Sequence, residues 1–220
     1  MTVFYADFGN NTDADAQVAA GVGTIGDPFN AKAFIDKAKW TGTGIDTDEY
    51  LIKGQAYTNI TIGTALRAAS INSWDLDDFG PWQFESQLDT NFGVSTSSVI
   101  SNGIMKGNKI ALAMSTYNDI IFMTSDVTGA NQSGTTNLNG CTVIGDLKFI
   151  NGSNTLNMTD CILTGNFVKQ GDGTHTINLN NSVMIQSLTT IENISTWTVN
   201  NTDSQFEYVS TITYPEFAEV

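Results

Sequence analysis

Apolar and polar positions recur with a period of about twenty residues in the C-terminal half of the chain. Four similar segments begin at Leu138, Met158, Leu179 and Val199, at spacings of 20, 21 and 20 residues. Two further columns follow in this alignment: Cys141, Cys161, Ser182 and Thr202, and then Leu147, Phe167, Leu188 and Phe206. Such a repeat is typical of a solenoid, in which each unit buries its apolar face against its neighbours.

The residues inside the repeat favour strands over helices. A unit of this length is too short for a pair of helices, and Thr, Val, Ile, Asn and Gly dominate it. The columns also lack the recurring leucines of a leucine-rich repeat. We therefore expect a parallel β-helix with coils about 4.8 Å apart, so that residues of one column touch. Asn180 and Asn200 are expected where the chain turns, since Asn tolerates left-handed backbone geometry.

The N-terminal region predicts a cap for one open end of the stack. Asp27 is expected to cap a helix that has Pro28 at its first position. One side of this helix would hold Phe29, Ala33, Phe34 and Ala38. A solenoid exposes unpaired backbone at its ends, and this helix would close one of them. The first strands are then expected near residues 49–62, where Tyr50, Ile52, Ile60 and Ile62 alternate with polar residues.

These segments, in this order, resemble a known family. A short strand, then GTIGDPFNAKAFIDKA from Gly23, then EYLIKGQAYTNITIG from Glu49, then the coils are similar to parallel β-helix proteins of the pectin-lyase-like superfamily. The resemblance is to the versions found among phage structural proteins and surface proteins. The resemblance covers most of the chain and implies an all-β fold, a single-stranded right-handed parallel β-helix with a short N-terminal capping helix. It implies the fold more than the function, because this superfold carries lyases, hydrolases, adhesins and virion parts.

One structural domain is expected. Residues 1–48 would form the N-terminal strand and capping helix, 49–205 the coils with an insertion at about 70–98, and 206–220 a C-terminal tail. This tail carries aromatic residues at Phe206, Tyr208, Tyr214 and Phe217. It would either seal the last coil or lie on another chain.

The charge of the chain disfavours several partners. There are 9 basic and 23 acidic residues, and the formal net charge is -14. Such a protein repels nucleic acid and anionic lipid. The sequence contains no apolar run long enough to span a membrane, and its start, MTVFYADFGNNTD, does not resemble a secretion signal.

The repeat is lost between Ser70 and Ser98, where we expect a loop that leaves the stack. Aromatic and acidic residues alternate there and are the candidate interaction residues, together with the tail: Trp74, Asp75, Asp77, Asp78, Phe79, Trp82 and Phe84. They could contact another subunit, grip a sugar ring, or cover the side of the same molecule. The acidic residues lack the ordered spacing of a calcium loop, so no metal is expected.

Catalytic patterns are weak. A polysaccharide lyase would be expected to carry basic residues beside calcium ligands, but Arg67 is the single arginine. A glycoside hydrolase needs two carboxyl groups about 5 to 9 Å apart. In the aligned columns, Asp160 stands with Gly140, Asn181 and Asn201, and Asp146 with Asn166 and Ser187. Only the acidic cluster from Asp75 to Asp89 could still hold such a pair.

The cysteines and the histidine are expected to be structural. Cys141 and Cys161 share a column, which favours a buried stack of thiols, although a disulfide stays open. His175 lies in the Gly-rich segment QGDGTHT, and we expect a solvated turn residue.

The expected function is a non-enzymatic virion structural protein without a cofactor. It would be a phage head decoration protein or a fibre or tailspike-like module, which assembles with other virion proteins in the host cytoplasm. A homo-oligomer is expected, and proteins of this resemblance often form trimers. The alternative is a carbohydrate-binding or carbohydrate-cleaving β-helix protein at a cell surface.

Overall fold

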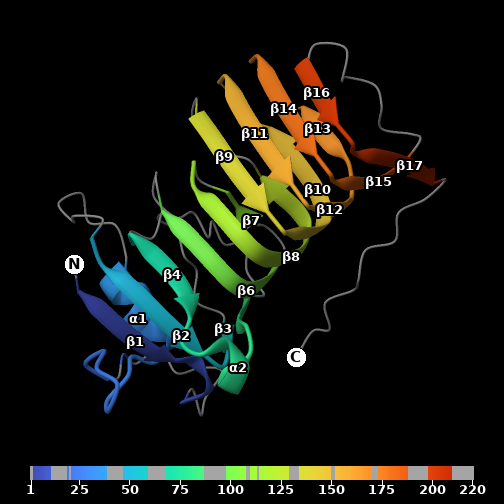
Figure 1. Ribbon diagram of the computed structural model, residues 1–220. Helices are drawn as coiled ribbons and strands as arrows, with labels where there is room; N and C mark the ends of the chain where they lie inside the picture. The colour runs from blue at the N-terminus through green and yellow to red at the C-terminus, as the bar shows by residue number, and fades with distance from the viewer. Residues whose placement is uncertain are drawn as a thin grey trace.

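The chain folds into a stack of parallel strands (Figure 1). The computed structural model describes residues 2–10, 19, 21–38, 47–58, 68–86, 98–107, 110–112, 114–128, 134–149, 152–169, 173–187 and 198–209. All pairings between its named strands are parallel. The predicted fold class, an all-β right-handed parallel β-helix with a short N-terminal helix, is confirmed.

The sheet winds around three faces. The strands of the first face are, in order of pairing, β1 (Val3–Asp7), β2 (Glu49–Lys53), β4 (Ser70–Ser73), β6 (Val99–Gly107), β8 (Thr116–Thr128), β9 (Gly134–Asn139), β11 (Asn154–Thr159), β14 (His175–Asn180) and β16 (Thr198–Thr202). The long strands β6 and β8 continue around a corner into the second face.

The second and third faces complete each coil. The second face consists of β3 (Gln55–Thr58), β5 (Trp82–Ser86), the continuations of β6 and β8, the first part of β10 (Thr142–Phe149), β12 (Ile162–Thr164), β15 (Val183–Ser187) and β17 (Gln205–Val209). The third face consists of β7 (Ile110–Ala111), the ends of β8 and β10, and β13 (Phe167–Lys169).

A column of left-handed residues makes the corner between the first and second faces. Successive coils place there Asn102, Asp119, Gly140, Asp160, Asn181 and Asp203, whose φ values lie between +47° and +62°. Asn, Asp and Gly tolerate this geometry better than other residues. The expectation that Asn180 and Asn200 turn the chain is therefore wrong: Asn180 ends β14 one residue before the turn at Asn181, and Asn200 lies inside β16.

The register of the last coil differs from the alignment of the sequence. Val199 lies opposite Ile177, and Asn201 lies opposite Leu179. The small-residue column continues from Ser182 to Ser204, whose hydroxyl accepts a hydrogen bond from the backbone N–H of Ser182 at 2.9 Å. The alignment matched similar letters, but the alternation of inward and outward side chains sets the register. Thr202 is therefore not in the cysteine column.

The two cysteines are buried free thiols in adjacent coils. The Cys141 thiol donates to the carbonyl of Tyr117, and the Cys161 thiol to the carbonyl of Leu138, both at 3.3 Å. A hydrogen bond to Cys161 and burial hold the pKa of Cys141 well above its ordinary value. The Cys141 thiol therefore stays protonated at neutral pH and serves as a small core side chain.

His175 lies in the interior of the stack and not in a solvated turn, so the expectation for it is wrong. It begins β14, is 0 % exposed, and its ring centroid lies 5.2 Å from that of Phe149. His175, Ile177 and Leu179 alternate inward along the strand. This period-2 pattern outweighs the turn-like letters that precede it.

The N-terminal segment covers the free edge of β1. The backbone N–H groups of Tyr5 and Asp7 donate to the carbonyls of Gly23 and Phe29 at 2.9 and 2.8 Å, and Phe29 donates back to Tyr5 at 2.9 Å. Behind this edge, the ring of Phe34 in α1 (Ala31–Ala38) lies 5.1 Å from that of Tyr50. The segment and α1 together close this end of the solenoid.

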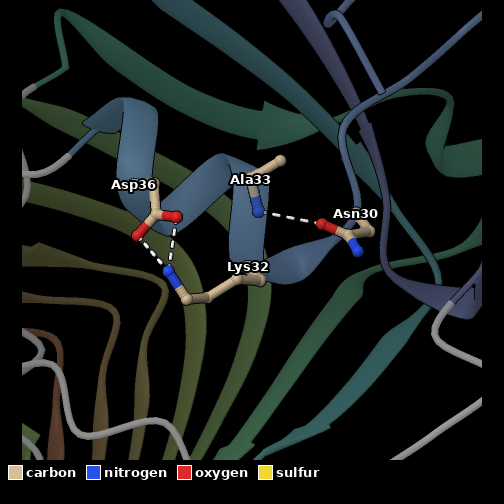
Figure 2. Close-up of polar contacts among 4 residues, drawn as sticks. All are labelled: Asn30, Lys32, Ala33 and Asp36. Atoms are coloured by element: carbon tan, nitrogen blue, oxygen red, sulfur yellow. Dashed lines mark hydrogen bonds and ion pairs between the residues drawn. The ribbon is translucent and has the colours of Figure 1, made fainter. Parts of the chain in front are cut away.

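The helix α1 begins later than the sequence suggests. Asn30 is its cap, because its Oδ1 accepts a hydrogen bond from the backbone N–H of Ala33 at 2.8 Å (Figure 2). An ion pair between Lys32 and Asp36 lies on the partly exposed side of the helix (Figure 2). Asp27 instead forms a turn with Thr24, so the expectation that it caps the helix is wrong.

Stability is expected to fall at alkaline pH. Burial and the Asp48 carboxylate raise the pKa of Tyr50 above its ordinary 10.0. The unfolded chain then releases this proton at lower pH than the folded chain, so the free energy of unfolding declines as the pH rises to about 10 and beyond. Urea unfolding at about pH 8 and about pH 10 measures the decline, which Tyr50→Phe should reduce. A free energy of unfolding that is constant or rising over this range would contradict the assignment.

Candidate interaction surface

Between β4 and β5 the chain leaves the stack. Residues 74–81 form a short excursion at the corner between the first and second faces, and it contains α2 (Leu76–Phe79) (Figure 1). The Asp75 carboxylate caps this helix by accepting from the backbone N–H groups of Asp77 and Asp78, both at 3.1 Å. The Ser73 hydroxyl donates to the carbonyl of Gly80 at 2.7 Å and closes the base of the excursion.

Aromatic rings gather around one lysine at this excursion. The ring centroid of Trp74 lies 4.8 Å from that of Tyr5 and 6.2 Å from that of Phe79. The Lys53 ammonium lies 4.7 Å from the Trp74 ring and 4.6 Å from the Phe79 ring, and its nitrogen is 3.3 Å from a carboxylate oxygen of Asp7. These contacts combine cation–π attraction with an ion pair. We call these five residues the aromatic corner.

The aromatic corner is open to solvent. Phe79 is 48 % exposed and the neighbouring Leu76 is 47 % exposed. Beside them lies an open depression of about 360 Å³, lined by Asp7, Gly9, Lys53, Gly54 and Phe79. Gly54 has φ +79°, and a Cβ there would lie 2.6 Å from the backbone nitrogen of Gly9. A side chain at this position would therefore disrupt the floor of the depression.

The expectation that Trp82 and Phe84 project from the stack is wrong. They are 0 % and 3 % exposed, and they belong to β5, which pairs with β3 and β6. The Trp82 Nε1 donates to the carbonyl of Ser101 at 2.9 Å. The indole ring packs directly over Gly103, where an added Cβ would lie only 2.2 Å from a ring carbon. Neither residue can contact a partner in the folded chain. Residues 87–97 of the expected insertion lie outside the described part.

The remaining predicted residues divide between the excursion and the tail. The structure brings Trp74 and Phe79 together with Asp75, Asp77 and Asp78 at α2, and these three acidic residues are exposed. Tyr208 lies in β17, but its side chain is outside the described residues, as are Tyr214 and Phe217. Their role stays a prediction.

Tyr5, Asp7 and Lys53 were not predicted from the sequence as members of this site. They lie in β1 and β2, and parallel register places Asp7 opposite Lys53 at the ends of these strands. The signal was the letter pattern YLIKG, in which Lys53 follows the buried Ile52 and must face outward.

The acidic residues of the corner column are arranged differently from the sequence alignment. Asp119, Asp160 and Asp203 alternate with Gly140 and Asn181, so neighbouring carboxylates are two coils, or about 9.6 Å, apart. The Asn181 amide donates to Asp160 at 2.6 Å. Their side chains are exposed, and each residue holds the left-handed turn of its coil. In the described ranges, no three His, Cys, Asp or Glu side chains converge as a metal site would require.

In comparisons with protein-family models, curated proteins and solved structures, nothing matches the chain significantly. Among the described helices, none has the length and apolarity needed to cross a membrane. What the molecule does must therefore be inferred from its surface.

Proposed function

We propose that the protein is a non-enzymatic structural module of a phage virion, a head decoration protein or a fibre or tailspike-like segment. The observation that carries this proposal is the aromatic corner, in which the exposed ring of Phe79 packs beside the half-buried rings of Trp74 and Tyr5 on the side of the stack. Exposed aromatic residues beside charges are typical of the energetically dominant parts of protein interfaces. The virion assignment itself is supported by the resemblance of the N-terminal segments and the coils to phage β-helix proteins.

The chemistry of the aromatic corner suits binding better than proton transfer. The Lys53 ammonium is engaged by two rings and by Asp7, and the Asp75 carboxylate is engaged as a helix cap. The exposed Asp77 and Asp78 stand beside the apolar Phe79 and Leu76. A complementary partner surface would carry basic residues around an apolar side chain.

One observation favours the second candidate, a carbohydrate-binding protein. The depression beside Phe79 combines an exposed ring with a carboxylate and an ammonium group, Asp7 and Lys53. Stacking on a ring together with hydrogen bonds to charged groups is how many proteins hold a sugar. The same residues would then serve glycan binding at a cell surface.

The variant Phe79→Ala separates the two candidates. The ring is half exposed, so we expect the free energy of unfolding to fall by less than about 1 kcal/mol. As an interface anchor, its loss should weaken binding to virion partners by about 30-fold or more, measured as co-sedimentation with particles. The matched control is Val22→Ala, since Val22 is 63 % exposed and lies in the N-terminal segment.

The contradicting outcome is specific. If the wild-type chain binds a glycan in an array, and Phe79→Ala loses this binding while co-sedimentation is unchanged, then the carbohydrate function replaces the structural one.

A further inference from the structure

The outer side of the second face is aliphatic. Along its central strands, outward side chains alternate with buried ones. Six of the outward side chains are aliphatic: Ile104, Ile121, Ile144, Ile162, Val183 and Ile185. Ile162 is 46 % exposed and Ile121 is 36 % exposed, and the other four are half-buried. We call these six residues the aliphatic face. They form one contiguous strip. Ile104 pairs with Ile121, and Ile162 with Val183, in neighbouring strands, and Met123, two residues after Ile121 on β8, pairs with Ile144 between them.

The first face of the same coils shows what a solvated surface looks like in this protein. Its outward positions on β9, β11, β14 and β16 include a ladder of Asn137, Asn157, Asn178 and Asn200. Each of the last three amides donates to the asparagine of the preceding coil, at 2.7, 2.6 and 2.7 Å. The second face therefore carries aliphatic residues where the same architecture accommodates polar ones. A contiguous apolar strip of this kind marks a contact surface.

We propose that two copies of the chain associate through the aliphatic face. Copies with a net charge of -14 repel each other, so they can approach closely only through an uncharged surface. The outward side chains between the described ends of the face are uncharged, and Met123, Thr142 and Thr164 complete it. The exposed carboxylates of Asp119, Asp160 and Asp203 lie outside the strip, at the corner with the first face. Including the charged residues at its two ends, the strip crosses roughly seven strands and has a surface area on the order of 500 Å² per copy. A pair would bury about 1,000 Å², the lower limit for specific association, so the dimer is expected to be reversible.

The charges at the two ends of the aliphatic face determine the arrangement of the pair. Lys106 lies at the end near the N-terminus, 3.8 Å from Glu85, and Glu207 lies at the other end on β17. A two-fold axis that lies in the plane of the contact, at right angles to the solenoid axis, makes the solenoids antiparallel and brings Lys106 of each copy near Glu207 of the other. A parallel arrangement, including a parallel trimer, would place like charges together. The antiparallel two-fold pair is therefore the one we propose. It rests on the proposed function only in that a structural module and a dimer both require the protein to assemble.

Sedimentation equilibrium of the full chain over a wide concentration range tests this proposal. The wild-type mass should rise from 23.7 kDa to twice that value. Ile162→Glu places a carboxylate in the middle of the contact and should raise the dimer dissociation constant by about a hundredfold or more. Thr155→Glu is the matched control, because it adds the same charge to an outward position of the first face, and it should leave the dimer intact. Far-UV circular dichroism checks that both variants are folded.

A charge exchange tests the two-fold arrangement. Glu207→Lys alone should weaken the dimer, and adding Lys106→Glu should restore it, because the exchanged pair is again complementary across the axis. A strict monomer, a trimer, or equal association of Ile162→Glu and Thr155→Glu would overturn the proposal. Phe79→Ala lies outside the aliphatic face and should leave this equilibrium unchanged, so failure here is distinguishable from failure of the proposed function.

Discussion

Replacing Trp82 by alanine is expected to lower the free energy of unfolding by about 3 to 5 kcal/mol. The side chain is 0 % exposed and fills the space above Gly103 inside the coil. Its removal leaves a cavity and also leaves the carbonyl of Ser101 without the indole N–H that it accepts at 2.9 Å. Because the whole stability of a domain is only about 5 to 15 kcal/mol, this variant is close to unfolding at room temperature. Urea or thermal unfolding followed by circular dichroism measures the loss.

Trp74→Ala is the matched control for this prediction. Trp74 is half-buried and packs against Tyr5 and Lys53 at the surface of the aromatic corner. Its truncation should cost about 1 kcal/mol, since solvent can fill the vacated space. If the two tryptophan variants unfolded at the same urea concentration, Trp82 would not be the interior residue described above.

The second large effect is expected from Gly165→Ala. A Cβ at Gly165 would lie 1.9 Å from the carbonyl oxygen and 2.5 Å from the carbonyl carbon of Gly145 in the preceding coil. These are backbone atoms and cannot rotate away, so the two coils must separate. The hydrogen bond from Gly165 N–H to the carbonyl of Ile185, at 3.0 Å, ties the same residue to the following coil. We expect a loss of about 3 kcal/mol or more in the free energy of unfolding.

Gly26→Ala is the control for the glycine prediction. No atom lies within 4 Å of a Cβ built there, so its effect should stay within about 0.5 kcal/mol. Equal melting temperatures of the two alanine variants would show that the coils are not packed as closely as the structure indicates.

The sequence predicts the central coils well because their columns are long and regular. Leu138 and Met158 lie opposite each other, and Leu147 lies opposite Phe167, as the repeat indicates. The last coil was misaligned because VNNT resembles LNNS in its letters. The alternation of inward and outward side chains places Val199 opposite Ile177, which is a longer spacing than in the preceding coils. An alignment by similar residues cannot detect such a change of spacing.

The candidate site was predicted only in part. Trp82 and Phe84 alternate with Gln83 and Glu85, a pattern of a half-buried strand, but their acidic surroundings suggested a loop. Lys53 and Tyr5 reach Trp74 only because strands distant in the sequence are adjacent in register. The aliphatic face was hidden for a different reason. In segments such as TVIGD and CILTG, apolar residues occupy inward and outward positions alike, and composition alone cannot tell a buried strand from an exposed apolar one.

The most direct test of the structural role is to locate the protein in its source culture. Particles are purified from a lysate on a density gradient, and mass spectrometry then quantifies the chain in the particle fractions and in the soluble fractions. The proposed function predicts that the chain bands with the particles, in a fixed ratio to their major protein. A chain found only in the soluble fractions, where it binds or cleaves a polysaccharide, would contradict this function.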